Sequence, residues 1–208
     1  MTSLEVRAAA ALFDMDGTLI DSTAVVEHLW GLFCRKHGVD LGELLAFAHG
    51  RPTRQTLARF LPDASPSERE SVALGLEQRE LDALDGIVEI PGARALLDGL
   101  ERVALPWAVV TSAPRELAVR RMGAAGLPLP RVLVPADEVE QGKPHPAGYL
   151  RAAELLGVDV RQCVVLEDAE PGVRAGLAAG ARVVVVGALE VAGLDRVADL
   201  TRLSLLPV

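Results

Sequence analysis

The feature that most restricts the possible folds of this chain is an apolar run that stops at a pair of acids. Residues 8–13 (AAAALF) are all apolar, and Asp14, Met15, Asp16 and Gly17 follow directly. A short apolar run closed by turn residues predicts a strand buried on both faces. Side chains alternate along a strand, so both acids leave it on the same side. Two carboxylates this close are costly, which predicts a cation or a metal-bound anionic substrate between them.

A DxDG sequence also occurs in ordinary solvated turns, so this motif alone does not establish a site. A calcium-binding loop can be tested by its spacing. Counted from Asp14, that loop needs Gly at its sixth position and Glu at its twelfth, where this chain has Leu19 and Val25. A calcium loop of this type is therefore excluded.

Composition limits the class of protein. The chain has 208 residues, 50% of them hydrophobic, and a formal net charge of -8. This length suffices for one large domain or a domain with a smaller one. The acidic balance argues against nucleic acid or an anionic membrane as a partner, and 3% aromatic residues leave few stacking surfaces for bases. No apolar run approaches the roughly 20 residues of a membrane helix. We expect a cytoplasmic monomer or weak dimer with a small-molecule partner.

The chain between the first strand and the next one is helical in pattern. Helices are predicted over residues 22–38, 41–48, 52–61 and 65–84, and the last of these begins with a Ser65–Glu68 capping box that contains Pro66. A simple crossover between parallel strands needs about a dozen residues and one helix. We therefore expect a helical cap domain at residues 22–86, inserted into a core domain made of residues 1–21 and 87–208.

The remainder of the chain alternates between strand and helix patterns. Strands are predicted at residues 107–110, 131–134, 163–166 and 182–186. Helices are predicted at residues 92–103, 114–126, 146–156 and 172–179, with a last short helix after Ala188. Unalternating apolar strands between helices are typical of a parallel sheet covered on both faces. The predicted fold is therefore α/β, with a Rossmann-like parallel sheet as its core.

Polar residues follow several of these strands at the point where each strand ends. Thr111 and Ser112 follow the second strand, Lys143 lies in the loop after the third, and Glu167 and Asp168 end the fourth. Each set has an ordinary explanation as a helix cap, a turn or a charge pair at a helix start. Ligands bind beyond the carboxyl ends of the strands in open parallel sheets. Together with the first two acids, these sets therefore predict one site.

The donor types indicate what such a site would hold. Carboxylates without a cluster of Cys or His favour a hard cation that prefers oxygen, and Mg²⁺ is the expected ion. A metal beside a lysine, hydroxyls and free N–H donors suits a phosphoryl group. A Walker P-loop is excluded because the glycine it needs is replaced by Asp137, and Pro144 follows Lys143.

The same motifs carry a resemblance to a known family. FDMDGTL (residues 13–19), VTS (110–112), GKP (142–144) and EDA (167–169) occur in the order and spacing of the haloacid dehalogenase superfamily of phosphatases. The chain resembles that superfamily over nearly its whole length, and the helical insertion is similar to the superfamily's mobile cap. HGR (49–51), IPGA (90–93), WAVVTS (107–112) and QGKPHP (141–146) resemble the branch that acts on glycerol phosphate, deoxysugar phosphates and related polyol phosphates.

The resemblance implies catalytic and metal-binding roles. Asp14 would be the nucleophile that forms an aspartyl-phosphate, and Asp16 would protonate the leaving alkoxide and then activate water. Mg²⁺ would be held by Asp14, the backbone carbonyl of Asp16 and Asp168, with Glu167 contacting the ion through water or supporting its ligands. The ion would let an anionic nucleophile approach an anionic phosphate.

The resemblance also implies a phosphate-binding set. The Thr111 hydroxyl and backbone N–H groups around Met15, Asp16 and Ser112 would hold the phosphoryl oxygens. Lys143 would neutralise the nucleophile and the phosphate together, for which a point charge is sufficient.

Residues of the helical insertion would select the group that carries the phosphate. The candidates are His49, Arg51, Arg54 and Glu27. Arg51 is the strongest of them, because it follows a His-Gly bend directly before a helix that begins at proline. The other basic residues, such as Arg120 and Arg121, are assigned to solvent.

Several related functions stay open. Phosphoglycolate hydrolysis is one, because few cap residues separate small acids from polyols. A sugar-phosphate mutase like β-phosphoglucomutase is another, but that enzyme has a histidine twelve residues after its nucleophile, where this chain has Val26, and His28 faces about 200° away around the helix. A non-catalytic binding protein on the same fold would lack part of the motif set, and this chain lacks none of it.

Overall fold

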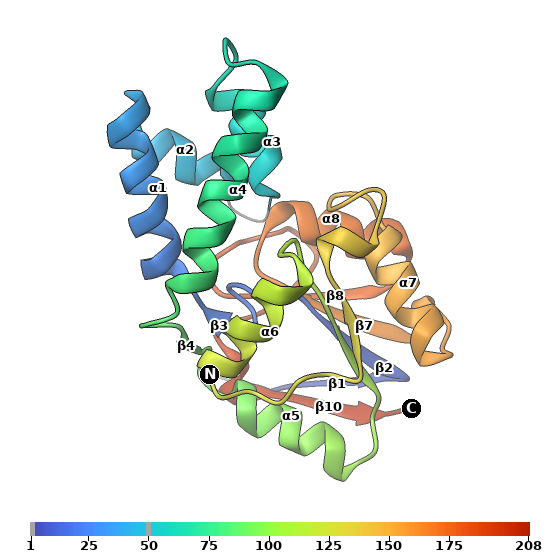
Figure 1. Ribbon diagram of the computed structural model, residues 1–208. Coiled ribbons are helices and arrows are strands. Elements are labelled where there is room, and N and C mark those ends of the chain that lie inside the picture. The colour runs from blue at the N-terminus through green and yellow to red at the C-terminus, as the bar shows by residue number, and fades with distance from the viewer. Residues whose placement is uncertain (1–2, 49–50) are drawn as a thin grey trace.

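The computed structural model describes residues 3–48 and 51–208 of the chain, and a parallel sheet lies at its centre. Within the described residues the sheet has six strands in the order β6-β5-β2-β7-β8-β9, all paired in parallel (Figure 1). The strands are β2 (Ala10–Phe13), β5 (Trp107–Val110), β6 (Val132–Val134), β7 (Cys163–Glu167), β8 (Arg182–Val186) and β9 (Asp195–Val197). The predicted α/β fold with a parallel core sheet is confirmed.

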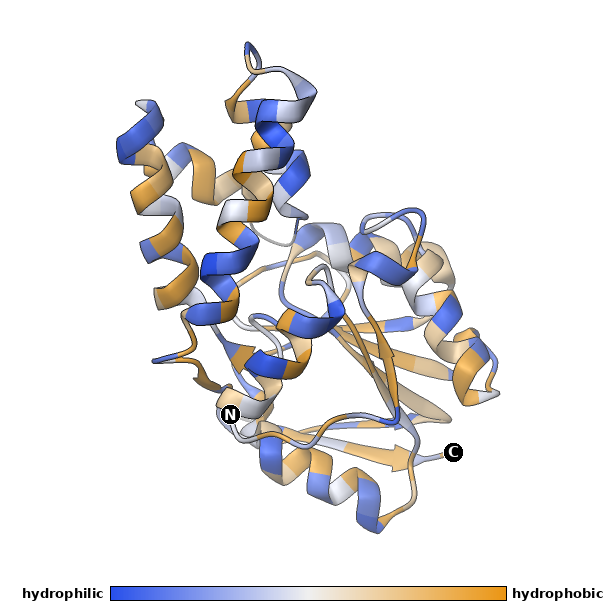
Figure 2. Cartoon of the chain, viewed as in Figure 1, coloured by the Kyte–Doolittle hydropathy of each residue, from blue (hydrophilic) through white to orange (hydrophobic). Residues whose placement is uncertain are grey.

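The alternation of side chains along β2 divides the core into two halves. Phe13 lies on the face covered by α5 (Ala93–Arg102) and α6 (Arg115–Ala124). Leu12 lies on the opposite face, which α7 (Ala147–Leu156) and α8 (Glu170–Ala179) cover. Because both faces are covered, the central strands β2 and β5 are apolar throughout and lack a polar side. In Figure 2 the central strands are accordingly orange, while the outer surfaces of the helices carry the blue residues.

The insertion forms a helical layer above the sheet in Figure 1. It consists of α1 (Thr23–His37), α2 (Leu41–Ala48), α3 (Thr53–Phe60) and α4 (Pro66–Asp82). These helices bury their own apolar cluster, which includes Trp30, Phe33, Leu44 and Leu57 and is separate from the clusters on the sheet. The predicted capping box at the start of α4 is present, with Ser65 and Glu68 each bonding the other's backbone N–H.

Two short strands join the insertion to the sheet. β3 (Ile20–Asp21) directly precedes α1 and pairs antiparallel with β4 (Val88–Glu89), which follows α4. The pairing brings the two ends of the insertion side by side, so the chain leaves and returns at one place. No sequence pattern predicted these strands, because each has only two residues.

The C-terminal prediction was wrong. The expected short helix after Ala188 is absent from the described residues, which instead contain β9, a 3₁₀ turn at Leu200–Arg202 and β10 (Leu203–Pro207). β10 pairs in parallel with β1 (Leu4–Ala8). Leu203 and Leu205 are buried on either side of exposed Ser204, which is the period of a strand. Further 3₁₀ turns lie at Ala136–Glu138 and Val160–Gln162.

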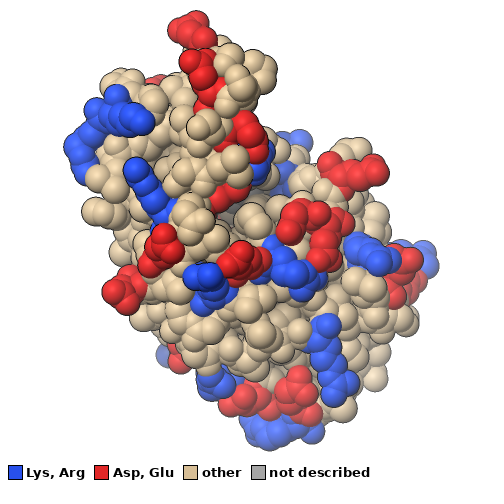
Figure 3. Space-filling model, viewed as in Figure 1, with Lys and Arg blue, Asp and Glu red and all other residues tan. Residues whose placement is uncertain are grey.

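Two further features of the fold are the distribution of surface charge and the character of the helices. Figure 3 shows acidic and basic side chains interspersed over the visible face, without a broad area of one sign. Among residues 3–48 and 51–208, no helix combines the length and the apolar character needed to cross a bilayer.

Candidate active site

The turn after β2 presents the first acidic pair. The Asp14 backbone N–H donates to the Leu166 carbonyl at 2.9 Å, so Asp14 still lies in the ladder between β2 and β7. The Met15 carbonyl then accepts from the N–H groups of Leu19 and Ile20, which closes a tight turn. Gly17 in this turn has φ +86°, and a Cβ atom there would lie 2.0 Å from Asp168 Oδ2. Only glycine can therefore bring this turn against the end of β7.

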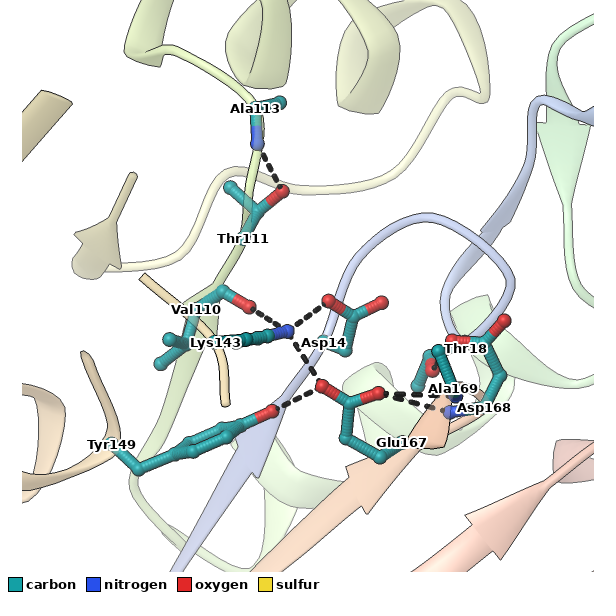
Figure 4. Close-up of polar contacts among 10 residues, drawn as sticks. All are labelled: Asp14, Thr18, Val110, Thr111, Ala113, Lys143, Tyr149, Glu167, Asp168 and Ala169. Atoms are coloured by element: carbon teal, nitrogen blue, oxygen red, sulfur yellow. Dashed lines mark hydrogen bonds and ion pairs between the residues drawn. The ribbon is translucent and has the colours of Figure 1, made fainter. Parts of the chain in front are cut away.

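Lys143 joins the ends of three strands. Its Nζ donates to Asp14 Oδ1, to Glu167 Oε1 at 2.6 Å and to the Val110 carbonyl at 3.1 Å (Figure 4). These three acceptors use all three donors of the ammonium. Burial by itself lowers the pKa of Lys143, but the carboxylates of Asp14 and Glu167 outweigh burial and raise that pKa above its ordinary value. Lys143 is thus a fixed positive charge at the centre of the site.

Glu167 is held on both oxygens. Oε1 accepts from Lys143 and also from the Tyr149 hydroxyl at 2.7 Å, while Oε2 accepts from the backbone N–H groups of Asp168 and Ala169 at 3.1 and 3.3 Å (Figure 4). Tyr149 comes from α7 and is completely buried beneath the site. Sequence reasoning missed it, although it is the one tyrosine of the chain and follows the GKP motif by five residues.

The acidic residues form a cluster suited to a cation. Oxygen atoms of Asp14, Glu167 and Asp168 lie within 4.8 Å of one another. Burial raises the pKa of Asp14 well above its ordinary value, and the charges of Glu167 and Asp168 raise it further, although Lys143 opposes them. The cluster thus holds three acidic groups, and Lys143 bonds two of them, so the acids outnumber the one ammonium. An all-oxygen donor set with excess negative charge fits a hard divalent cation.

The predicted phosphate-binding residues lie near this cluster. Thr111 and Ser112 follow β5 and line the same cavity as Asp14 and Lys143. The Thr111 hydroxyl accepts from the Ala113 N–H at 3.0 Å and is buried. The side chain of Met15 is buried in the core, so this residue can offer only its backbone to a ligand.

Asp16 occupies a different position from the other acids. Its Oδ1 accepts from the Ser22 hydroxyl at 2.5 Å and from Arg121 Nη1 at 2.9 Å. Ser22 directly precedes α1, so Asp16 contacts both the insertion and the core. Asp16 lines the cavity with a side chain that is 29% exposed.

The assignment of Arg121 to solvent was wrong. Its side chain is 6% exposed and bonds Asp16, while the side chain of neighbouring Arg120 is 45% exposed and pairs with Glu116. The sequence held a signal for this difference. Arg121 is four residues after buried Leu117, which puts it on the core face of α6, while Arg120 faces outward.

A cavity of about 540 Å³ lies between these residues and the insertion. The insertion contributes Val26, Glu27, Trp30, Arg51, Arg54, Gln55, Glu77 and Glu80 to its lining. Arg51 donates to the Phe47 carbonyl at 2.5 Å and lies over the Phe47 ring. Arg54 bonds Glu70 at 2.8 Å and also pairs with Glu77. Predicted His49 lies outside the described residues.

Comparisons with known proteins agree with this site. The family of haloacid dehalogenase-like hydrolases matches residues 8–180. Hexitol phosphatase A of Escherichia coli is 44% identical to the chain, over 88% of the chain and 84% of that enzyme. 2-Deoxyglucose-6-phosphate phosphatase 2 of Saccharomyces cerevisiae is 36% identical, over 93% of the chain and 88% of that enzyme.

A solved structure shares the fold at similar coverage. CbbY from Rhodobacter sphaeroides, in complex with phosphate, superposes with a TM-score of 0.78 and 27% identity, covering 91% of this chain and 92% of CbbY. The family match covers more than half of the chain and includes each of the motifs that meet in the site. The chain therefore belongs to the haloacid dehalogenase-like hydrolases.

Proposed function

We propose that this protein is a Mg²⁺-dependent phosphatase that hydrolyses the monophosphate ester of a small sugar or polyol through an aspartyl-phosphate on Asp14. The observation that carries the proposal is the junction at Lys143. One buried ammonium bonds the carboxylates that follow two neighbouring strands, and Asp168 lies in the same acidic cluster. The two phosphatase relatives described above support the reaction class.

Asp14 suits the role of nucleophile because it is fixed and faces the cavity. Lys143 holds Oδ1, so the carboxylate keeps one orientation beneath the phosphate position. In the first step, a bond forms between an Asp14 oxygen and phosphorus while the bond from phosphorus to the ester oxygen breaks. In the second step, water attacks the phosphorus and releases inorganic phosphate and free Asp14. Two smaller barriers replace one large barrier.

Asp14 and Asp168, with the backbone carbonyl of Asp16, would hold Mg²⁺ in this proposal, and Glu167 would support them. When bound, the ion offsets the repulsion between the carboxylate nucleophile and the phosphate dianion. Glu167 has both oxygens engaged by Lys143, Tyr149 and backbone N–H groups. Its role is therefore to keep Lys143 and the start of α8 in place.

Asp16 and the phosphate-binding residues complete the site. Asp16 would give a proton to the leaving alkoxide and take one from the attacking water. The Thr111 hydroxyl and the backbone N–H groups near Met15 and Ser112 would hold the phosphoryl oxygens, and Lys143 would add positive charge. Each of these roles needs a polar group held in a fixed position at the strand ends.

The insertion favours a hydroxylated, uncharged substrate body. Glu27 and Glu77 line the cavity and can accept hydrogen bonds from hydroxyl groups. Arg54 is paired with Glu70 and Glu77, so its charge is compensated within the protein. This balance suits a sugar or polyol better than a substrate with a second anionic group. Val26 stands where a mutase would have its histidine, and it lines the cavity, which favours hydrolysis over phosphoryl transfer between sugar positions.

A substrate panel tests the function. With Mg²⁺ present, kcat/KM should be higher for sorbitol 6-phosphate and 2-deoxyglucose 6-phosphate than for phosphoglycolate or a sugar bisphosphate. The products should be inorganic phosphate and the free alcohol, without an isomerised sugar phosphate. A preference for phosphoglycolate, or formation of an isomer, would contradict the substrate class or the reaction.

Variants test the chemistry. Asp14→Asn should abolish turnover, because an amide is a poor nucleophile, while the control Asp21→Asn, at an exposed acid in β3, should keep wild-type activity. Asp16→Asn should slow both steps. In a separate test, protein quenched with acid during turnover should carry one phosphoryl group on the peptide that contains Asp14. Substantial turnover by Asp14→Asn would remove this residue from the nucleophile role.

A further inference from the structure

Arg121 is a buried cation that the reaction scheme above does not use. It lies on α6, 5% of its surface is exposed, and it lines the cavity. Nη1 donates to Asp16 Oδ1 at 2.9 Å, and Nη2 lies 3.7 Å from Glu80 Oε2. Its Nε has no hydrogen-bond partner in the part of the chain that the structure describes. Burial of a guanidinium with incomplete hydrogen bonding is costly, so a role beyond packing is expected.

The hydrogen bonds around Asp16 restrict how its carboxylate can turn. Ser22 and Arg121 both donate to the same oxygen, Oδ1. Ser22 comes from the start of the insertion, while Arg121 comes from a helix packed on the sheet. Two donors from different elements on one oxygen hold that oxygen in place and limit the rotation of the carboxylate.

Glu80 connects the same guanidinium to the insertion. It lies on α4, which contacts α6, and it is nearly buried. Arg121 therefore stands between a carboxylate of the core turn and a carboxylate of the insertion. The pair therefore links α4 to α6, the two helices that carry Glu80 and Arg121.

We propose that Arg121 is a positioning residue for Asp16, and that Glu80 on α4 holds Arg121 in place. Arg121 does not touch the reacting atoms. It fixes the carboxylate that exchanges protons with the leaving group and with water, and it makes that position depend on the placement of the insertion. The inference rests on the proposed acid–base role of Asp16.

The leaving group of the substrate separates this role from a structural one. kcat/KM reports the steps up to release of the alcohol, so it depends on protonation of the leaving oxygen. An alkoxide from 2-deoxyglucose 6-phosphate needs that proton, while p-nitrophenolate is a stable anion that leaves without it. Displacement of a catalytic group by about 1 Å can cost about 100-fold. Arg121→Met should therefore lower kcat/KM for the sugar phosphate by about 10- to 100-fold, and for p-nitrophenyl phosphate by less than about threefold.

Matched variants complete the test. Arg120→Met removes the exposed neighbour on the same helix and should leave both values of kcat/KM unchanged. Arg121→Lys keeps the positive charge but replaces the planar fork by a single donor nitrogen, and it should recover part of the activity on the sugar phosphate. Arg121→Met/Glu80→Met also removes the buried carboxylate that Arg121→Met leaves unpaired on α4, so it keeps the test usable if the single variant folds poorly. It should show the same dependence on leaving group.

Two results would overturn the inference. Equal losses on both substrates in Arg121→Met would mean a structural role, and a gain on the sugar phosphate would mean that Arg121 opposes protonation of Asp16 and does not position it. Asp16→Asn, measured in parallel, distinguishes a failure of the proposed function. If that variant shows the leaving-group dependence and Arg121→Met does not, only the role of Arg121 is refuted. If neither shows it, the acid role of Asp16 is refuted, and the role of Arg121 with it.

Discussion

Gly172 offers the sharpest single test of how the site is built. It lies in the first turn of α8, where a Cβ atom would be 1.7 Å from Glu167 Oε1 and 1.9 Å from Glu167 Cδ. Real Cβ contacts essentially never fall below 3.0 Å, so Oε1 would have to move by about 1.3 Å. Gly172→Ala therefore acts on the carboxylate that holds Lys143, without changing any polar group.

The size of the effect follows from the bonds to that oxygen. Lys143 Nζ and the Tyr149 hydroxyl lie 2.6 and 2.7 Å from Glu167 Oε1, and a shift of 1.3 Å cannot preserve both. A hydrogen bond to a charged group is worth about 1.5–3 kcal/mol, while alanine in place of glycine in a helix returns about 1 kcal/mol. We expect the free energy of unfolding to fall by about 3 kcal/mol, and Tm by about 6–12 °C for a chain of this size.

Thermal unfolding and kcat measure the two consequences. Since Lys143 would lose a fixed partner, kcat should fall by at least about tenfold. Gly75→Ala is the matched control: Gly75 lies in α4 with no atom within 4 Å of an added Cβ, so this variant should be slightly more stable and fully active. A Gly172→Ala protein with the Tm and kcat of the wild type would refute the view that Glu167 is a rigid support for Lys143.

The other predictions concern charge, metal and the insertion. Burial raises the pKa of Glu80 to about 7 from 4.5, so the native state holds a proton that the unfolded chain has released. The stability contributed by this group is complete below pH 4.5 and is lost as pH rises through 7. Between pH 4.5 and 8, the free energy of unfolding measured in urea should therefore fall by about 2–3 kcal/mol more in the wild type than in Glu80→Gln. Parallel curves of unfolding free energy against pH for the two proteins would contradict this. Lys143→Met leaves buried carboxylates without their cation, so its free energy of unfolding should fall by about 3–5 kcal/mol and its phosphatase activity should be lost. A variant with wild-type stability and activity would disprove the role of Lys143 in joining Asp14 and Glu167. MgCl₂ at about 100 times its Kd should add about 2.7 kcal/mol of stability, and Asp168→Asn should abolish this gain; hydrolysis that persists in excess EDTA would defeat the metal assignment. Arg51→Ala should change the ratio of kcat/KM between two polyol phosphates more than activity on p-nitrophenyl phosphate, and an equal loss on every substrate would make Arg51 structural.

Most helices and strands could be predicted because their signals are local. The capping box at Ser65 and Glu68 is made by residues three positions apart, and glycines 38, 157 and 180 end three helices in the left-handed conformation that the patterns at those positions indicate. The acidic residues after β2 and β7 were also predictable, since parallel strands present their carboxyl ends at one edge. These features need no knowledge of distant partners.

Features that depend on distant partners were not predictable in the same way. β10 forms only because β1, nearly 200 positions earlier, offers it an unpaired edge. The two-residue strands β3 and β4 are too short to have a pattern, and they exist because they pair with each other. Tyr149 reads in the sequence as an ordinary core residue of α7, and its role depends on the position of Glu167 below Lys143.

The sequence by itself determined the type of sheet, the presence of a helical insertion and the acids, lysine and hydroxyls that follow the strands, because apolar period and turn chemistry are written in neighbouring residues. Only the tertiary structure decided which charges meet. Asp14 and Lys143 are 129 positions apart, and Asp16 and Arg121 are 105 apart, so whether each is a solvated charge or a buried partner depends on the packing of elements between them. A charge is stable in the interior only beside its counter-charge, and no local pattern reports where that counter-charge will be.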